Sequence, residues 1–81
     1  MLKIPSGIAE AMNLSSQLQE TINKDNLLVW LDEQMENFHR QILRPPAPKV
    51  ISGLIHAKQM YQANVEPKAI IDWLFLSLIS H

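Results

Sequence analysis

Two pairs of side chains in this 81-residue sequence have the types and spacing for chemistry. Glu36 and His39 are three residues apart, as in helices that offer a carboxylate and an imidazole to a pair of metal ions. That kind of site needs a second such motif and further carboxylates from other helices, but the motif occurs only once. Ser52 and His56 would meet on one helix face. A nucleophile and its base also need an orienting group, however, and segment 48–64 contains no acidic residue. The sequence therefore predicts neither a metal site nor a catalytic pair.

The remaining residue types exclude most cofactor chemistry. The chain has no cysteine, which excludes disulfides, cysteine-bound zinc and thiol catalysis. Its glycines are Gly7 and Gly53, so it has no glycine-rich loop that could hold a phosphate. Trp30, Tyr61 and Trp73 stand singly within apolar stripes, where packing in a core explains them better than stacking on nucleic-acid bases. We therefore expect no enzyme activity and no cofactor.

The charge pattern gives little support for a polyanionic partner. The net charge is −1 at pH 7, whereas nucleic-acid-binding domains are usually strongly basic. Residues 1–39 hold six carboxylates and two lysines, and residues 40–81 hold five basic residues and two carboxylates. We interpret these halves as complementary solvated faces. No run of about 20 apolar residues exists to span a membrane, and the absence of cysteine fits a cytoplasmic protein. We therefore expect a cytoplasmic protein that contacts neither a membrane nor nucleic acid directly.

Apolar residues recur at helical spacing in four segments, and they make up 47% of the chain, which is enough for a core. The first helix is predicted over 6–22, with Ser6 as its N-cap. The second is predicted over 25–44, with Asp25 or Asn26 as its N-cap. The expected buried stripes consist of Ile8, Ala11, Met12, Leu14, Leu18 and Ile22 in the first helix, and of Leu27, Leu28, Leu31, Met35, Phe38 and Ile42 in the second.

Proline and asparagine mark the other boundaries. Three prolines fall within 44–48, where no helix can continue. Because the parts on either side are too short to fold alone, we place this turn inside a single domain that covers 1–81. A third helix should run from about Pro48 to Asn64. Asparagine suits the left-handed conformation that ends many helices. Pro67 suits the first turn of a fourth helix. The predicted fold is an all-α, compact bundle of four helices.

The last helix, predicted to begin at Pro67, is apolar on nearly every side from Ala69 to Ile79, so something must cover all of it. Ile70, Leu74 and Leu78 share the side that we assign to the core. The other side is expected to bind another protein chain, unless the proline turn or the first helix covers it. The predicted core residues are Leu31, Met35, Phe38, Leu54, Ile70, Leu74 and Leu78. The predicted partner-binding residues are Asp72, Trp73, Phe75, Leu76 and Ile79.

Segment 55–78 contains a helix, the turn Asn64-Val65-Glu66-Pro67 and a leucine-rich last helix. Together with the earlier Leu27-Leu28-Val29-Trp30-Leu31, this order resembles the C-terminal domain of the delta-prime subunit of the bacterial DNA polymerase III clamp loader. The resemblance implies a collar-like helical domain that packs against other clamp-loader subunits in DNA replication. It also implies a structural role, with ATP and primer-template contacts lying mainly elsewhere.

We therefore expect a non-enzymatic protein–protein assembly domain with clamp-loader-like subunits as its partners. The alternative is an unrelated helical adaptor or a homo-oligomerisation domain that covers the apolar last helix with a copy of itself. A small helical enzyme comes third. An enzyme would need a cleft with clustered titratable groups, and the sequence shows no such cluster.

Overall fold

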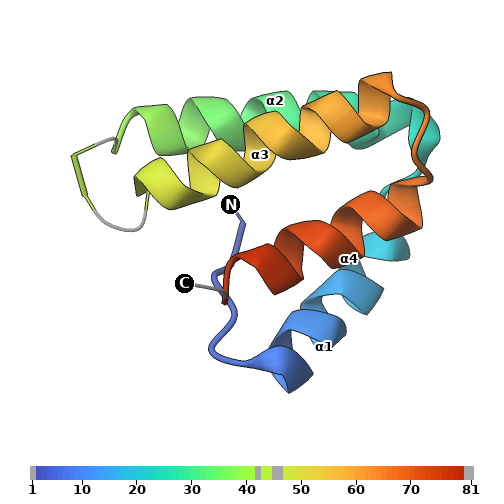
Figure 1. Cartoon of the computed structure of the whole chain (residues 1–81), viewed down its shortest axis with the longest axis horizontal. Coiled ribbons are helices and arrows are strands. Elements are labelled where there is room, and N and C mark those ends of the chain that lie inside the picture. Colours follow the sequence, from blue (N-terminus) through green and yellow to red (C-terminus); the bar gives the residue numbers. More distant parts are fainter. Residues whose placement is uncertain (1, 42, 45–46, 80–81) are drawn as a thin grey trace.

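The computed structural model describes residues 2–41, 43–44 and 47–79, and most of these residues are helical (Figure 1). The fold is an all-α bundle of four helices, as the sequence predicts, and no strand occurs among the described residues. The helices are α1 (Ile8–Gln19), α2 (Lys24–His39), α3 (Ala47–Gln62) and α4 (Pro67–Ser77).

The four helices form two pairs that α4 joins. α2 and α3 lie side by side as one pair, and α1 and α4 form the other (Figure 1). α4 also packs against α3, so it has a helix on each of two sides. This position explains its apolar sequence, because a helix between two neighbours needs more than one apolar face. The N-terminal segment enters between the pairs, where Leu2 joins the core.

α2 begins earlier than predicted because Asn23 caps it. The Asn23 side chain accepts hydrogen bonds from the backbone N–H groups of Asp25 and Asn26, at 2.9 and 3.2 Å. The Asn26 side chain in turn accepts from the Asn23 N–H, at 2.7 Å. This reciprocal capping box satisfies backbone donors that a first helical turn leaves without partners. The prediction of Asp25 or Asn26 as the cap is therefore wrong, because several neighbouring residues here are good N-caps and only the fold selects one.

α2 also ends earlier than predicted, at His39 instead of Arg44. A proline shows where a helix must have ended, and the chain can leave the helix before that point. α3 then begins at Ala47, one residue before the predicted start. Ile42 of the predicted stripe and residues 45–46 of the predicted proline turn lie outside the described residues.

The predicted turn between α3 and α4 is confirmed. Asn64 has φ of 63°, in the left-handed region. Its N–H bonds to the Tyr61 carbonyl at 3.1 Å, and the Val65 N–H bonds to the Met60 carbonyl at 3.0 Å. This pair of bonds is a Schellman motif, which satisfies carbonyls at the end of a helix. Pro67 then starts α4, where its missing N–H costs nothing.

The core follows the prediction closely on three of the helices. Of the seven predicted core residues, Met35 is half-buried. The other six, Leu31, Phe38, Leu54, Ile70, Leu74 and Leu78, are buried. The described core consists of Leu2, Ala11, Leu27, Leu31, Phe38, Ala47, Val50, Ile51, Leu54, Ala57, Ile70, Ile71, Leu74, Phe75 and Leu78.

α1 departs from the prediction in the side that it buries. It begins at Ile8 with Gly7 in the cap position, one residue after the predicted Ser6. Ile8 and Met12 were expected in the buried stripe but are 68% and 44% exposed. Apolar residues occupy more than one side of α1, so its periodicity alone does not select the buried one. The buried residues of α1 are Ala11 and Ser15.

α4 passes close to α3 at Gly53, as the small residues Gly53 and Ala57 on one face of that helix predict. A Cβ atom at Gly53 would lie 3.4 Å from Leu74 Cδ1 and 3.6 Å from Ser77 Oγ, which are ordinary contact distances. Glycine inside a helix costs roughly 0.5–1 kcal/mol relative to alanine. Gly53→Ala should therefore raise the free energy of unfolding by about that amount in urea denaturation.

A matched Gly53→Leu variant should lower the free energy of unfolding, because its larger side chain would overpack the contact with α4. A Gly53→Ala variant less stable than the parent chain would show that α4 lies closer to α3 than described.

Candidate functional site

Four of the five residues predicted to bind a partner lie on α4, and Ile79 lies in the turn directly after it. The five residues have different surroundings. Phe75 is only 3% exposed and belongs to the core. Asp72 and Trp73 are half-buried, each against a neighbouring helix, and Leu76 and Ile79 are half-buried as well. α1 therefore covers part of the side of α4 that we expected to bind a partner. Cover by the first helix is the alternative that the sequence leaves open.

Asp72 is held by two polar side chains of α1. Its Oδ1 atom accepts hydrogen bonds from the Ser15 hydroxyl and from Gln19 Nε2, the second at 3.0 Å. Gln19 Nε2 also donates to Ser15 Oγ at 2.8 Å, and Ser15 is 1% exposed. Polar groups buried at an apolar interface cost free energy when they lose their partners. This cluster therefore fixes how α1 lies along α4.

Trp73 lies at the edge of α4 that faces α3. Its ring stacks on the His56 imidazole, with ring centroids 4.5 Å apart and planes at 27°. Ser52, one turn earlier on α3, is exposed and makes no hydrogen bond to His56. Lys49 Nζ donates a hydrogen bond to the Leu78 carbonyl at 3.3 Å. Together with Ser52, His56 and Trp73, Lys49 lines a cavity of about 310 Å³.

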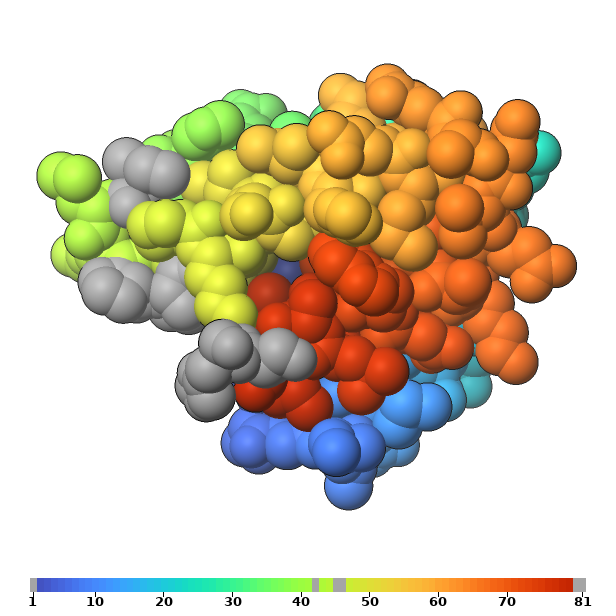
Figure 2. Space-filling view, in the orientation of Figure 1, coloured from blue at the N-terminus to red at the C-terminus, as the bar shows by residue number. Residues whose placement is uncertain are grey.

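An apolar surface continues from α4 onto α1. The two helices run in opposite directions (Figure 1), and Ser15 bonds to Asp72. The turns of α1 before Ser15 therefore lie beside the turns of α4 after Asp72, and in Figure 2 α4 is seen between α3 above and α1 below. We use the term seam surface for the exposed or half-buried apolar residues along this junction, which are Ile8, Met12, Leu76 and Ile79.

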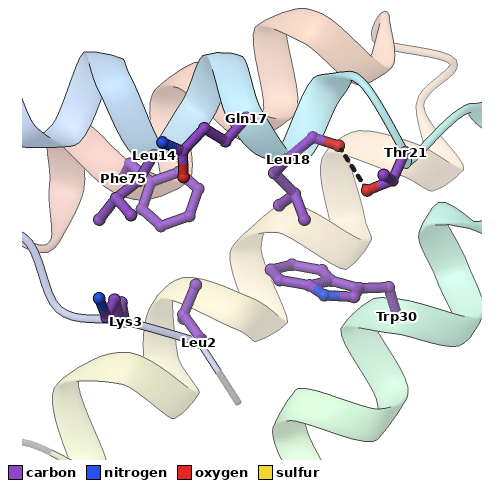
Figure 3. A pocket seen from close by; sticks show the side chains of 8 residues that line it. All are labelled: Leu2, Lys3, Leu14, Gln17, Leu18, Thr21, Trp30 and Phe75. Carbon is purple, nitrogen blue, oxygen red and sulfur yellow. Dashed lines mark hydrogen bonds between the residues drawn. The ribbon is translucent and has the colours of Figure 1, made fainter.

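A groove of about 270 Å³ lies on the other side of α1, where α1, α2, α4 and the N-terminal segment meet (Figure 3). We call it the Trp30 groove. Leu18 and Trp30 lie at one side of the space in Figure 3, and Leu2 and Phe75 lie at the other. Its apolar lining residues are Leu2, Leu14, Leu18, Trp30 and Phe75, and its polar ones are Lys3, Gln17 and Thr21.

Gln34 fixes the N-terminal segment at the end of this groove. The Leu2 N–H donates to Gln34 Oε1 at 2.7 Å, and both residues are buried. Gln34 lies on the same buried side of α2 as Leu31 and Phe38. A polar residue within an apolar stripe was the signal for this contact, since a buried amide needs a hydrogen-bond partner.

The other candidate sites of the sequence are dispersed. Glu36 pairs with Arg40 at 2.9 Å on the solvent face of α2. Among the residues that the structure describes, no group of three His, Asp or Glu side chains could hold a metal ion. The Tyr61 hydroxyl donates to the Lys24 carbonyl at 3.2 Å, which ties α3 to the start of α2.

Two further findings bear on function. None of the helices in the described part of the chain is long and apolar enough to cross a membrane. Comparison with protein-family models, curated proteins and solved structures finds no match to this chain. The likeness to the clamp-loader subunit therefore stays an expectation drawn from the turn at 64–67 and the last helix.

Proposed function

We propose that this chain is a non-enzymatic assembly domain that binds another protein through the seam surface and the adjoining Trp73. The observation that carries the proposal is the exposure of Ile8 and Met12 on α1. The Ser15–Asp72 hydrogen bond places their turns of α1 beside the end of α4, where Leu76 and Ile79 are half-buried. Single exposed apolar residues are common on soluble proteins, but contiguous apolar patches often mark interaction sites. This patch lies along two helices whose relative position the Asp72 cluster fixes.

The shape of the seam surface suits a helix of the partner. Ile8 and Met12 are one turn apart on α1. Leu76 and Ile79 are three residues apart, in the last turn of α4 and in the turn that follows it. A helix that lay along the junction would bury one apolar face against both rows, with contacts at the spacing i, i+3, i+4.

The leading partner in this proposal is a clamp-loader-like subunit in DNA replication, which rests on the resemblance of the last helix and its turn to the collar domain. The second candidate partner is another copy of this chain. Two copies could bury the seam surface in an isologous contact, in which the same patch serves both sides. The mass of the purified chain in solution separates the two, because only self-association doubles it.

Charged substitutions in the seam surface test the proposal. Leu76→Asp combined with Ile79→Lys should abolish association, but both residues also pack against the core. Ile8→Lys combined with Met12→Glu is the cleaner variant, since these side chains are 68% and 44% exposed and do not belong to the core. It should leave the helical circular dichroism unchanged and weaken association by about a hundredfold, because burying two charges in place of two apolar groups loses several kcal/mol.

The matched control is Val29→Glu. Val29 is an apolar residue of α2 that is 58% exposed and lies outside the seam surface. Association is measured by light scattering for the chain alone and by affinity capture with clamp-loader subunits. Equal association of the seam variant and the Val29 control would rule out the seam surface as the binding site.

A further inference from the structure

We propose that the Trp30 groove binds a small amphipathic carboxylate, such as an aromatic ring that carries a short acidic chain. The groove is separate from the seam surface. Leu14 and Leu18 of α1 line the groove, whereas Ile8 and Met12 do not and, by their helical spacing, project from a different side of that helix. The two proposals can therefore succeed or fail independently.

The size of the groove limits its ligand. Its volume is about 270 Å³, whereas an apolar cavity of about 150 Å³ is enough to hold one benzene molecule. The groove therefore has room for one ring and a chain of a few atoms, somewhat less than the roughly 300–1,000 Å³ of sites for larger ligands.

The walls of the groove suit an aromatic ligand. The half-buried Trp30 ring lies across the space from Leu2, with Leu18 above it (Figure 3). Phe75 adds a second aromatic side chain to the lining. Aromatic side chains offer large apolar contact areas and favour stacked or edge-to-face rings. A ligand ring in this space would contact apolar side chains on several sides.

The charge of the lining favours an anion. None of the residues that line the groove is acidic, and Lys3 is the one cation among them. Neither ion pair among the described residues, Glu36–Arg40 or Asp32–Lys58, involves Lys3. The Gln17 side chain adds an amide donor to the same lining. An ammonium group at the edge of an apolar groove attracts a carboxylate and places its apolar part inside.

A hydrogen bond holds the N-terminal wall of the groove in place. The hydrogen bond from the Leu2 N–H to Gln34 fixes the backbone next to Lys3. A preformed site loses less conformational freedom on binding than a site that must first become ordered. This hydrogen bond therefore holds the backbone from which Lys3 contributes to the lining of the groove.

The test uses 4-phenylbutyrate as the probe and 4-phenyl-1-butanol as its uncharged analogue of similar size. Trp30 and Trp73 are the two tryptophans of the chain, and only Trp30 lines the groove. In ¹H–¹⁵N NMR spectra of the whole chain, 4-phenylbutyrate should shift the Trp30 indole signal saturably and leave that of Trp73 in place. The alcohol should bind at least about fivefold more weakly, because it cannot pair with Lys3.

Two variants locate the interaction. Lys3→Met should bind the acid and the alcohol equally, whereas Lys68→Met, which changes an exposed lysine outside the groove, should keep the preference for the acid. The absence of a saturable Trp30 shift at millimolar 4-phenylbutyrate would overturn the proposal. So would equal binding of the acid and the alcohol by the unchanged chain, or a shift centred on Trp73.

Discussion

Replacing Leu74 with alanine should lower the free energy of unfolding by about 2–5 kcal/mol. Leu74 is fully buried on α4, and its Cδ1 atom lies against Gly53 of α3. The shorter side chain would lose apolar contacts and leave a cavity at the junction of the two helix pairs. Because a domain of 81 residues has a total stability of only about 4–12 kcal/mol, the variant should be close to unfolding at room temperature.

Urea denaturation followed by circular dichroism measures this loss. The control is Leu43→Ala, since Leu43 is 93% exposed and its truncation should change stability by less than about 0.5 kcal/mol. A Leu74→Ala variant as stable as the Leu43 control would show that α4 does not pack as described.

Replacing Asp72 with alanine should cost about 1–3 kcal/mol of stability. The change removes the acceptor shared by Ser15 and Gln19, and it leaves the Ser15 hydroxyl buried with a poorer set of partners. Asp72→Asn should cost less, because its side-chain oxygen can still accept both hydrogen bonds.

Asp32→Ala is the matched control for the loss of a carboxylate. Asp32 pairs with Lys58 at 3.1 Å in an exposed position, so its removal should cost only about 0–1 kcal/mol. Thermal and urea unfolding of the three variants give the comparison. If Asp72→Ala and Asp32→Ala are equally stable, the Asp72 cluster does not hold α1 against α4.

The helix boundaries that the sequence predicts well are those with a local backbone cause. Asn64 and Pro67 restrict their own dihedral angles, so the turn between α3 and α4 can be predicted without knowledge of the rest of the fold. Asn23 is different, because Asp25 and Asn26 are equally suitable caps and the selection depends on how the preceding turn packs.

The buried side of a helix is harder to predict when polar residues complete the interface. Ser15 lies in the core because Asp72 of α4 accepts its hydrogen bond, and this pairing spans residues far apart in the sequence. The pattern of α1 alone favours Ile8 and Met12, which the structure leaves exposed. Periodicity within one helix identifies apolar residues, but the neighbouring helix determines which of them are covered.

The candidate sites also depend on how the helices pack, which the pattern of one helix does not show. The second face of α4 is visible in the sequence, but its partial cover by α1, including the burial of Phe75, depends on the order in which the helices pack. The Trp30 groove is not visible, because its lining comes from the N-terminal segment and three helices. Gln34 was the one local sign, as a polar residue on the buried side of α2.

The most direct test of the assembly role is photo-crosslinking from the seam surface in the cells that make this protein. A benzophenone amino acid replaces Met12 in one sample and Val29 of α2 in the other, since both positions are exposed. Our account predicts one adduct of discrete mass from position 12, either with a second copy of the chain or with another protein, and no such adduct from position 29. Uncrosslinked chain alone from position 12, or the same products from both positions, would contradict it.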